Sequence, residues 1–199
     1  MKLMEQNNSQ EQLLKRITSL LQKAHISYMI TGAISVIFYG RPRASHDIDF
    51  VVEAHTEDVD KILQAFNSLP QNEFLVDSPA IKDAIMQKFI FQILHLPTML
   101  KFDFWLLKDE PFDQERFQRK QKINIFGQPM FFSSAEDTIL IKLLWYKNSK
   151  IEKHLIDAAF VYQIQKKNLD KKYLALWSKK HNTTKLLKEI ATIDLTMYY

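Results

Sequence analysis

The sequence contains no cysteine. This absence excludes a disulfide scaffold, a thiol nucleophile and a zinc site with cysteine ligands. Glycine is nearly as scarce: only Gly32, Gly40 and Gly127 occur in 199 residues, so we expect each to meet a backbone requirement. No apolar run approaches the roughly 18 residues of a membrane span, and the first residues lack the apolar segment of a signal peptide. We therefore expect a soluble, cytoplasmic protein with no membrane partner.

What the sequence does contain is enough apolar material for a core. Hydrophobic residues make up 46% and aromatic residues 12%, which excludes a disordered chain. The net charge of +4 is unevenly placed, because residues 134–199 hold 12 Lys against 7 acidic residues. A basic C-terminal third suits an anionic partner such as a nucleotide or RNA. The alternative is a solvated, lysine-rich helical surface, and the charge alone favours this alternative.

The periodicity of apolar residues changes along the chain. Period-two patterns predict strands, and spacings of three and four predict helices. The predicted strands are Ser27–Thr31, Asp47–Glu53, Lys88–His95, Thr98–Leu107, Lys122–Phe126 and Met130–Phe132. The predicted helices before residue 134 are Ser9–Ala24, Ala33–Tyr39, Glu57–Leu69, Pro79–Met86 and Gln114–Arg119. After it they are Ala135–Tyr146, Glu152–Gln165, Lys171–His181 and Thr184–Ile193. This predicts an α+β core over 1–133 and a helical C-terminal subdomain over 134–199, packed on the core.

Asp47 and Asp49 are the most informative pair of residues. Residues two apart on a strand project from the same face, so the two carboxylates lie side by side. At ~4 Å such charges repel by roughly 4 kcal/mol at an effective dielectric constant of 20. A cation removes this repulsion, and Mg²⁺ prefers carboxylate oxygens together with substrate phosphates. The alternative is a solvated strand face with no ligand.

A third carboxylate strengthens the metal interpretation. Asp103 is the only acidic residue in the apolar strand Leu100–Leu106, where it shares a face with Lys101 and Trp105. If this strand neighbours Asp47–Glu53, three carboxylates converge. Such a set can hold the two metal ions, ~3.5–4 Å apart, that serve phosphoryl and nucleotidyl transfer. The tryptophans themselves are assigned to the core.

The turn before this strand has features of a phosphate site. Gly32 follows a strand and opens a helix with Ala33 and Ser35. Backbone N–H groups at a helix N-terminus bind phosphate, and glycine permits close approach. Ser35 and Arg43 add a hydroxyl and a guanidinium as further donors. A tight turn and a solvated arginine are the alternatives.

These residues, in this order, resemble the nucleotidyltransferase superfamily with the polymerase-β-like fold. Its pattern is a glycine turn between strand and helix, then D-x-D on a strand, then a third carboxylate on a later strand. Gly32-Ala33, Asp47, Asp49 and Asp103 match these positions. The chain departs from the usual Gly-Gly or Gly-Ser at Ala33, which lacks the hydroxyl that helps to hold phosphate.

The segment from Thr31 to Asp49 is especially similar to the branch that contains the abortive-infection AbiEii toxins. The later D-x-x-x-x-K pattern of that branch matches Asp137 and Lys142, and an acidic residue on the next helix matches Asp157. Asp137 also reads as the cap of its helix together with Ser134.

The resemblance implies a mixed sheet flanked by helices and an Mg²⁺- or Mn²⁺-dependent nucleotidyltransferase that uses an NTP. Asp47, Asp49 and Asp103 would be catalytic and metal-binding. The nucleotide- and phosphate-binding residues would be Gly32, Ala33, Ser35, Arg43, Lys142 and Asp157. The acceptor hydroxyl would belong to tRNA, another RNA or a protein, and an antitoxin would be a partner. A small-molecule, antibiotic-type transferase and a nucleotide-binding toxin–antitoxin partner without turnover are the alternatives.

Overall fold

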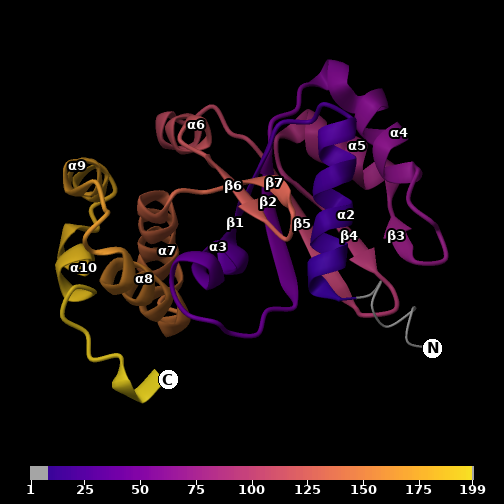
Figure 1. The fold of residues 1–199 in the computed structure, drawn as a ribbon. Coiled ribbons are helices and arrows are strands. Elements are labelled where there is room, and N and C mark those ends of the chain that lie inside the picture. The colour runs from indigo at the N-terminus through magenta and orange to yellow at the C-terminus, as the bar shows by residue number, and fades with distance from the viewer. Residues whose placement is uncertain (1–8, 199) are drawn as a thin grey trace. The chain divides into compact units, whose positions relative to one another are not determined.

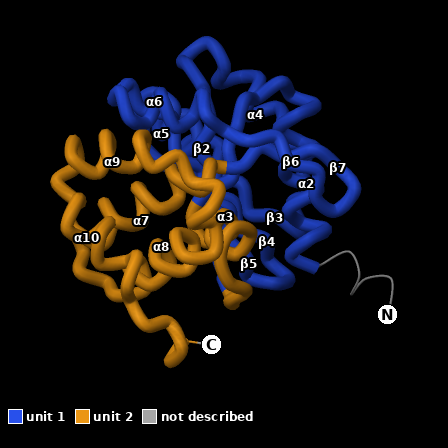
Figure 2. Tube along the Cα trace, turned by 60° about the vertical axis from the view of Figure 1, so that its left-hand side comes forward, with its two compact units in different colours: residues 1–31, 45–132 blue, residues 32–44, 133–199 orange. Residues whose placement is uncertain are grey.

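A computed structural model describes residues 9–198 of the chain. These residues divide into two compact units, which Figure 2 colours separately. The first unit takes the chain up to Thr31 together with Ser45–Phe132. The second takes Gly32–Ala44 and the residues from Ser133 onward. The sequence predicted a single boundary near residue 133. The structure differs from this prediction because residues 32–44 belong to the second unit.

The first unit is built on one seven-stranded mixed sheet with the order β3-β4-β5-β2-β1-β7-β6. Pairing is parallel between β2 and β5 and between β1 and β7, and antiparallel elsewhere. The strands are β1 (Tyr28–Thr31), β2 (Asp47–Val52), β3 (Phe74–Val76), β4 (Ile90–His95), β5 (Leu100–Leu106), β6 (Gln121–Ile125) and β7 (Gln128–Phe132).

Within residues 9–198, the same unit also contains α-helices, which Figure 1 labels. They are α2 (Gln10–Lys23), α4 (Val59–Asn67), α5 (Ser78–Gln87) and α6 (Pro111–Gln118). A 3₁₀ turn, η1 (Thr56–Asp58), precedes α4. The hydroxyl of Ser9 accepts a hydrogen bond from the N–H of Gln12 and caps α2.

One face of the sheet forms the core because apolar residues alternate along its central strands. Phe104 on β5 is fully buried and stacks on Phe50 at 5.1 Å and on Phe91 at 4.8 Å between ring centroids. Phe66 of α4 meets the Phe104 ring edge-on at 5.0 Å. Helix α4 therefore covers the Phe104 face, and the residues that alternate with Phe104 project from the opposite face.

The second unit is helical. Its α-helices are α3 (Gly32–Tyr39), α7 (Ala135–Ser149), α8 (Glu152–Gln165), α9 (Lys171–Lys180) and α10 (Thr184–Glu189), followed by the 3₁₀ turn η2 (Thr196–Tyr198). Helix α3 belongs here because it packs on α8 and α7. Where α3 ends, a Cβ on Gly40 would lie 2.9 Å from the carbonyl oxygen of Val36 and 3.2 Å from Cγ2 of Val161. Glycine is required there by close packing.

At the other two glycines the backbone requirement is a positive φ angle. Gly32 has φ 62° and Gly127 has φ 79°, a region that side chains with a Cβ disfavour. No helix in the described part of the chain has the length and apolarity needed to cross a membrane.

We expect Phe104→Ala to lower the free energy of unfolding by about 3–5 kcal/mol, because it opens a cavity at the centre of the aromatic core. Urea unfolding followed by circular dichroism measures the change. Phe89→Ala is the matched control, since that ring is 62% exposed. Equal losses in the two variants would contradict the packing described above.

Candidate active site

The register between β2 and β5 brings two of the predicted carboxylates together. Asp49 is the direct partner of Asp103, and Asp47 is the partner of Lys101. Paired residues on neighbouring strands project from the same face of a sheet. The strand of Asp103 is thus the neighbour of the D-x-D strand, as convergence of the three carboxylates requires. All three lie on the face opposite to Phe104.

The charges of this face act on one another. Burial raises the pKa of the Asp103 carboxyl, and the negative charges of Asp49 and Asp47 raise it further. The ammonium of Lys101 lies 3.9 Å from Oδ1 of Asp47, and both side chains are about half exposed (54% and 48%). Such an exposed, distant ion pair contributes little. The face therefore has an excess of negative charge.

Two neutral side chains donate hydrogen bonds to the carboxylates. Nε2 of Gln92 lies 2.9 Å from Oδ1 of Asp103, and Nε1 of Trp105 lies 3.4 Å from Oδ1 of Asp49. The prediction that Trp105 belongs to the core is wrong, because its side chain is 38% exposed on the carboxylate face. The period-two alternation of β5 already indicated that face. Nothing in the sequence singled out Gln92, whose role depends on the register of β4 with β5.

These carboxylate oxygens are suitable ligands for a metal ion. The three carboxylates are hard donors of the type that Mg²⁺ and Mn²⁺ take. Burial is the largest cause of the raised pKa of Asp103, and a cation would relieve the repulsion from Asp49 and Asp47 that adds to it. Among residues 9–198, however, no group of three His, Asp or Glu side chains is gathered closely enough to hold an ion in this conformation.

A hollow of about 400 Å³ lies against β3, β4 and β5 in the first unit. Gln92 and Lys101 line it, together with the aliphatic side chains of Leu75 and Leu94. Leu75, Leu94 and Lys101 form one row across β3, β4 and β5, and Asp47 continues that row on β2. The Gln92 and Lys101 side chains that line the hollow therefore project from the same face of the sheet as the carboxylates.

In the second unit, Asp157 of α8 is the centre of a buried ion cluster. The guanidinium of Arg43 binds it in a bidentate manner, with Nε 3.1 Å from Oδ1 and Nη2 2.9 Å from Oδ2. The ammonium of Lys142 on α7 lies 2.9 Å from Oδ2. The Lys142 and Asp157 side chains are only 3% and 1% exposed. Both predicted phosphate-binding cations thus contact Asp157 in this structure.

These ion pairs determine how the cluster titrates. Burial raises the pKa of Asp157, but the charge of Lys142 and the hydrogen bond from Arg43 outweigh burial, so the pKa is lowered overall. Burial, assisted by the charge of Lys142, lowers the pKa of the neighbouring His154. The cluster therefore retains an ionised aspartate and favours a neutral histidine.

The other predicted residues of this unit lie at the starts of α3 and α7. Ala33 and Ser35 are buried in the first turns of α3, which Gly32 opens. At the start of α7, the hydroxyl of Ser134 accepts a hydrogen bond from the N–H of Asp137, which confirms the cap. Asp137 is fully buried and accepts a hydrogen bond of 2.7 Å from the Tyr173 hydroxyl.

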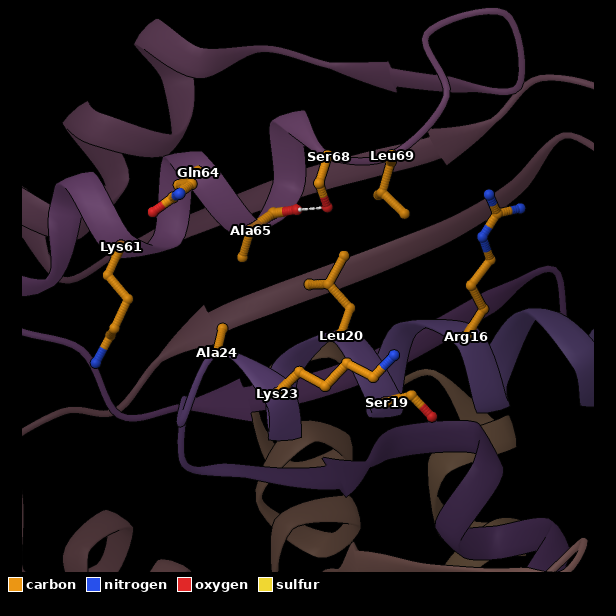
Figure 3. Close-up of a pocket in the computed structure, with 10 residues that line it drawn as sticks. All are labelled: Arg16, Ser19, Leu20, Lys23, Ala24, Lys61, Gln64, Ala65, Ser68 and Leu69. Atoms are coloured by element: carbon orange, nitrogen blue, oxygen red, sulfur yellow. Dashed lines mark hydrogen bonds between the residues drawn. The ribbon is translucent and has the colours of Figure 1, made fainter.

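A larger hollow, of about 510 Å³, opens between α2 and α4 (Figure 3). Its cationic side chains include Arg16, which pairs with Glu73, and Lys61, which pairs with Asp58, both at 2.7 Å. None of the residues predicted for the site lines it. The size of a hollow in this unit is therefore no guide to the predicted site.

We expect Asp157→Asn to lower the free energy of unfolding at pH 7 by about 3–5 kcal/mol, because it leaves two buried cations without their anion. The folded-state pKa of Asp157 lies below the unfolded value of about 3.9. Its contribution is thus fully present above that value and is lost as the pH falls through the folded-state pKa.

Urea unfolding at pH 7 and at pH 3 measures both effects. The two proteins should differ less at pH 3. Asp83→Asn, on the exposed surface of α5, is the control. A difference between the wild type and Asp157→Asn that stays constant with pH would contradict the ion cluster.

Comparison with known proteins places the chain in a family. The structure resembles that of the antibiotic-resistance factor ANT(2'')-Ia in solution, at 12% identity and TM-score 0.56, over 89% of this chain and 93% of that one. The crystal structure of ANT(2'')-Ia in complex with adenylyl-2''-tobramycin gives 12% identity and TM-score 0.57, over 86% and 95%. An antigenic nucleotidyltransferase-like protein from Paracoccidioides brasiliensis gives 16% and 0.50, over 86% and 88%.

These likenesses show the fold, which is the polymerase-β-like fold of nucleotidyltransferases. No curated protein sequence matches the chain. The family model described as "Nucleotidyl transferase AbiEii toxin, Type IV TA system" matches residues 21–197. Because this match spans most of the sequence, the chain belongs to the AbiEii family of nucleotidyltransferase toxins.

Proposed function

We propose that this nucleotidyltransferase transfers NMP from an NTP to an acceptor hydroxyl and requires Mg²⁺ or Mn²⁺. The observation that carries the proposal is the pairing of Asp49 with Asp103, with Asp47 on the same face. In the reaction, the acceptor oxygen forms a bond to the α-phosphorus while the bond from that phosphorus to the bridging oxygen breaks. Pyrophosphate is the leaving group.

Each carboxylate has a distinct part in this proposal. Asp47 and Asp49 would hold both ions, and Asp103 would hold the ion nearest the acceptor. When bound, the ions neutralise the triphosphate and stabilise charge on the attacking and leaving oxygens. Asp103 would also accept the proton of the acceptor hydroxyl.

The phosphate-binding residues remain predictions of the sequence. The N-terminus of α3, with Gly32, Ala33 and Ser35, is proposed to donate backbone N–H groups to the triphosphate. Gly32 directly follows Thr31, which pairs with Asp49 in the sheet, and this supports the proposal. Lys142 and Arg43 are proposed to neutralise phosphate charge, with Asp157 orienting them through the contacts described above.

The family supports an RNA or protein acceptor, with an antitoxin as partner, because its members are described as toxins. A small-molecule acceptor is the second candidate. It is supported by the fold shared with ANT(2'')-Ia, whose crystal structure contains adenylyl-2''-tobramycin. Incubation with each α-labelled NTP, Mg²⁺ and fractionated cell extract separates the two. Label in RNA or protein would support the first, and label in the small-molecule fraction the second.

We expect Asp49→Asn to abolish nearly all transfer, a loss of about a hundredfold or more, because charge stabilisation by the metal ions contributes several kcal/mol. The same change removes a repelling charge, so the metal-free variant should be as stable as the wild type or slightly more stable. Labelled transfer and thermal unfolding measure the two effects. Wild-type turnover in this variant would show that Asp49 binds no metal ion.

We expect Lys142→Ala to raise the KM for NTP, lower kcat, or both, to a similar degree for all four bases. An ammonium neutralises phosphate without reading the base. Because the variant also removes a partner of buried Asp157, the assay has to be run well below its unfolding temperature. A KM that changes for one base only would contradict the assignment.

A further inference from the structure

Gln92 is the side chain of β4 that touches a proposed catalytic carboxylate. It is the antiparallel partner of Asp103, which is itself the parallel partner of Asp49. One row across three strands thus carries an amide and two carboxylates on the same face. The amide Nε2 donates to Oδ1 of Asp103 at 2.9 Å, a normal hydrogen-bond length.

The pairing of Asp103 with Asp49 leaves the orientation of the two carboxylates unrestrained unless a hydrogen-bond donor holds one of them. Carboxylates on directly opposed residues repel, and each can rotate about its side-chain bonds to move away from the other. A hydrogen bond to one oxygen of Asp103 restricts that rotation.

A neutral donor is the appropriate kind of group at this position. A lysine or arginine would orient the carboxylate but would also neutralise it and compete with a cation. Gln92 supplies an N–H and leaves the negative charge in place. Gln92 also lines the hollow of about 400 Å³.

We propose that Gln92 is a positioning residue that fixes the orientation of Asp103 for metal binding and for contact with the acceptor hydroxyl; this inference rests on the proposed function. Partners that orient metal-binding side chains typically contribute 10–100-fold in metal affinity or activity. Trp105 makes the corresponding contact with Asp49 at 3.4 Å, a longer and weaker hydrogen bond. Gln92 should therefore contribute more than the indole N–H.

The test compares the full-length wild type with Gln92→Leu, Gln92→His and Gln87→Leu at pH 8. Gln92→Leu removes the donor, whereas a neutral histidine restores an N–H. Gln87 is an exposed glutamine at the end of α5 and serves as the matched control. The measurements are Mn²⁺ affinity by calorimetry without nucleotide, kcat and NTP KM, and thermal unfolding.

We expect Gln92→Leu to weaken Mn²⁺ binding about tenfold and lower kcat about tenfold or more, with NTP KM and the unfolding temperature little changed. Gln92→His should recover most of both losses, and Gln87→Leu should match the wild type. If Gln92→Leu matches Gln87→Leu while the wild type binds Mn²⁺ and transfers NMP, the positioning role is overturned. A wild type that neither binds Mn²⁺ nor transfers NMP would instead overturn the proposed function.

Discussion

The parallel register between β2 and β5 is the constraint on which the candidate active site depends. It makes Asp49 and Asp103 direct partners although they are distant in sequence. A slip of one residue would turn Asp103 toward the aromatic core and expose Phe104 in its place. The stacking of Phe104 on Phe50 and Phe91 therefore stabilises the register and, through it, the carboxylate face. Core packing and site geometry are two consequences of one alternation.

In the second unit the main electrostatic feature is the buried carboxylate of Asp157. Asp157 lies in a buried environment in which a lone carboxylate would be costly, and Arg43 and Lys142 supply its counter-charges. The residues that the family resemblance assigns to phosphate thus have a structural partner as well. In the proposed function Arg43 and Lys142 would also bind phosphate, so stability and nucleotide binding would share residues.

Much of the fold could be predicted because the elements have strong local signals. The alternation in Asp47–Val52 and Leu100–Leu106 gave both strands within a residue or two, and the capping residue Ser134 gave the start of α7. Strand β3 was missed because it has only three residues. Gln92 was missed because its importance comes from strand pairing, and the pairing of Arg43 with Asp157 was missed because burial of charge depends on tertiary contacts.

The most direct test of the central claim is a crystal structure with Mn²⁺ and a non-hydrolysable NTP, using the anomalous signal of manganese. The account predicts an anomalous peak bound by carboxylate oxygens of Asp47, Asp49 and Asp103, at the roughly 2.0–2.6 Å typical of hard divalent cations. A nucleotide-bound structure in which manganese lies away from all three carboxylates would contradict it.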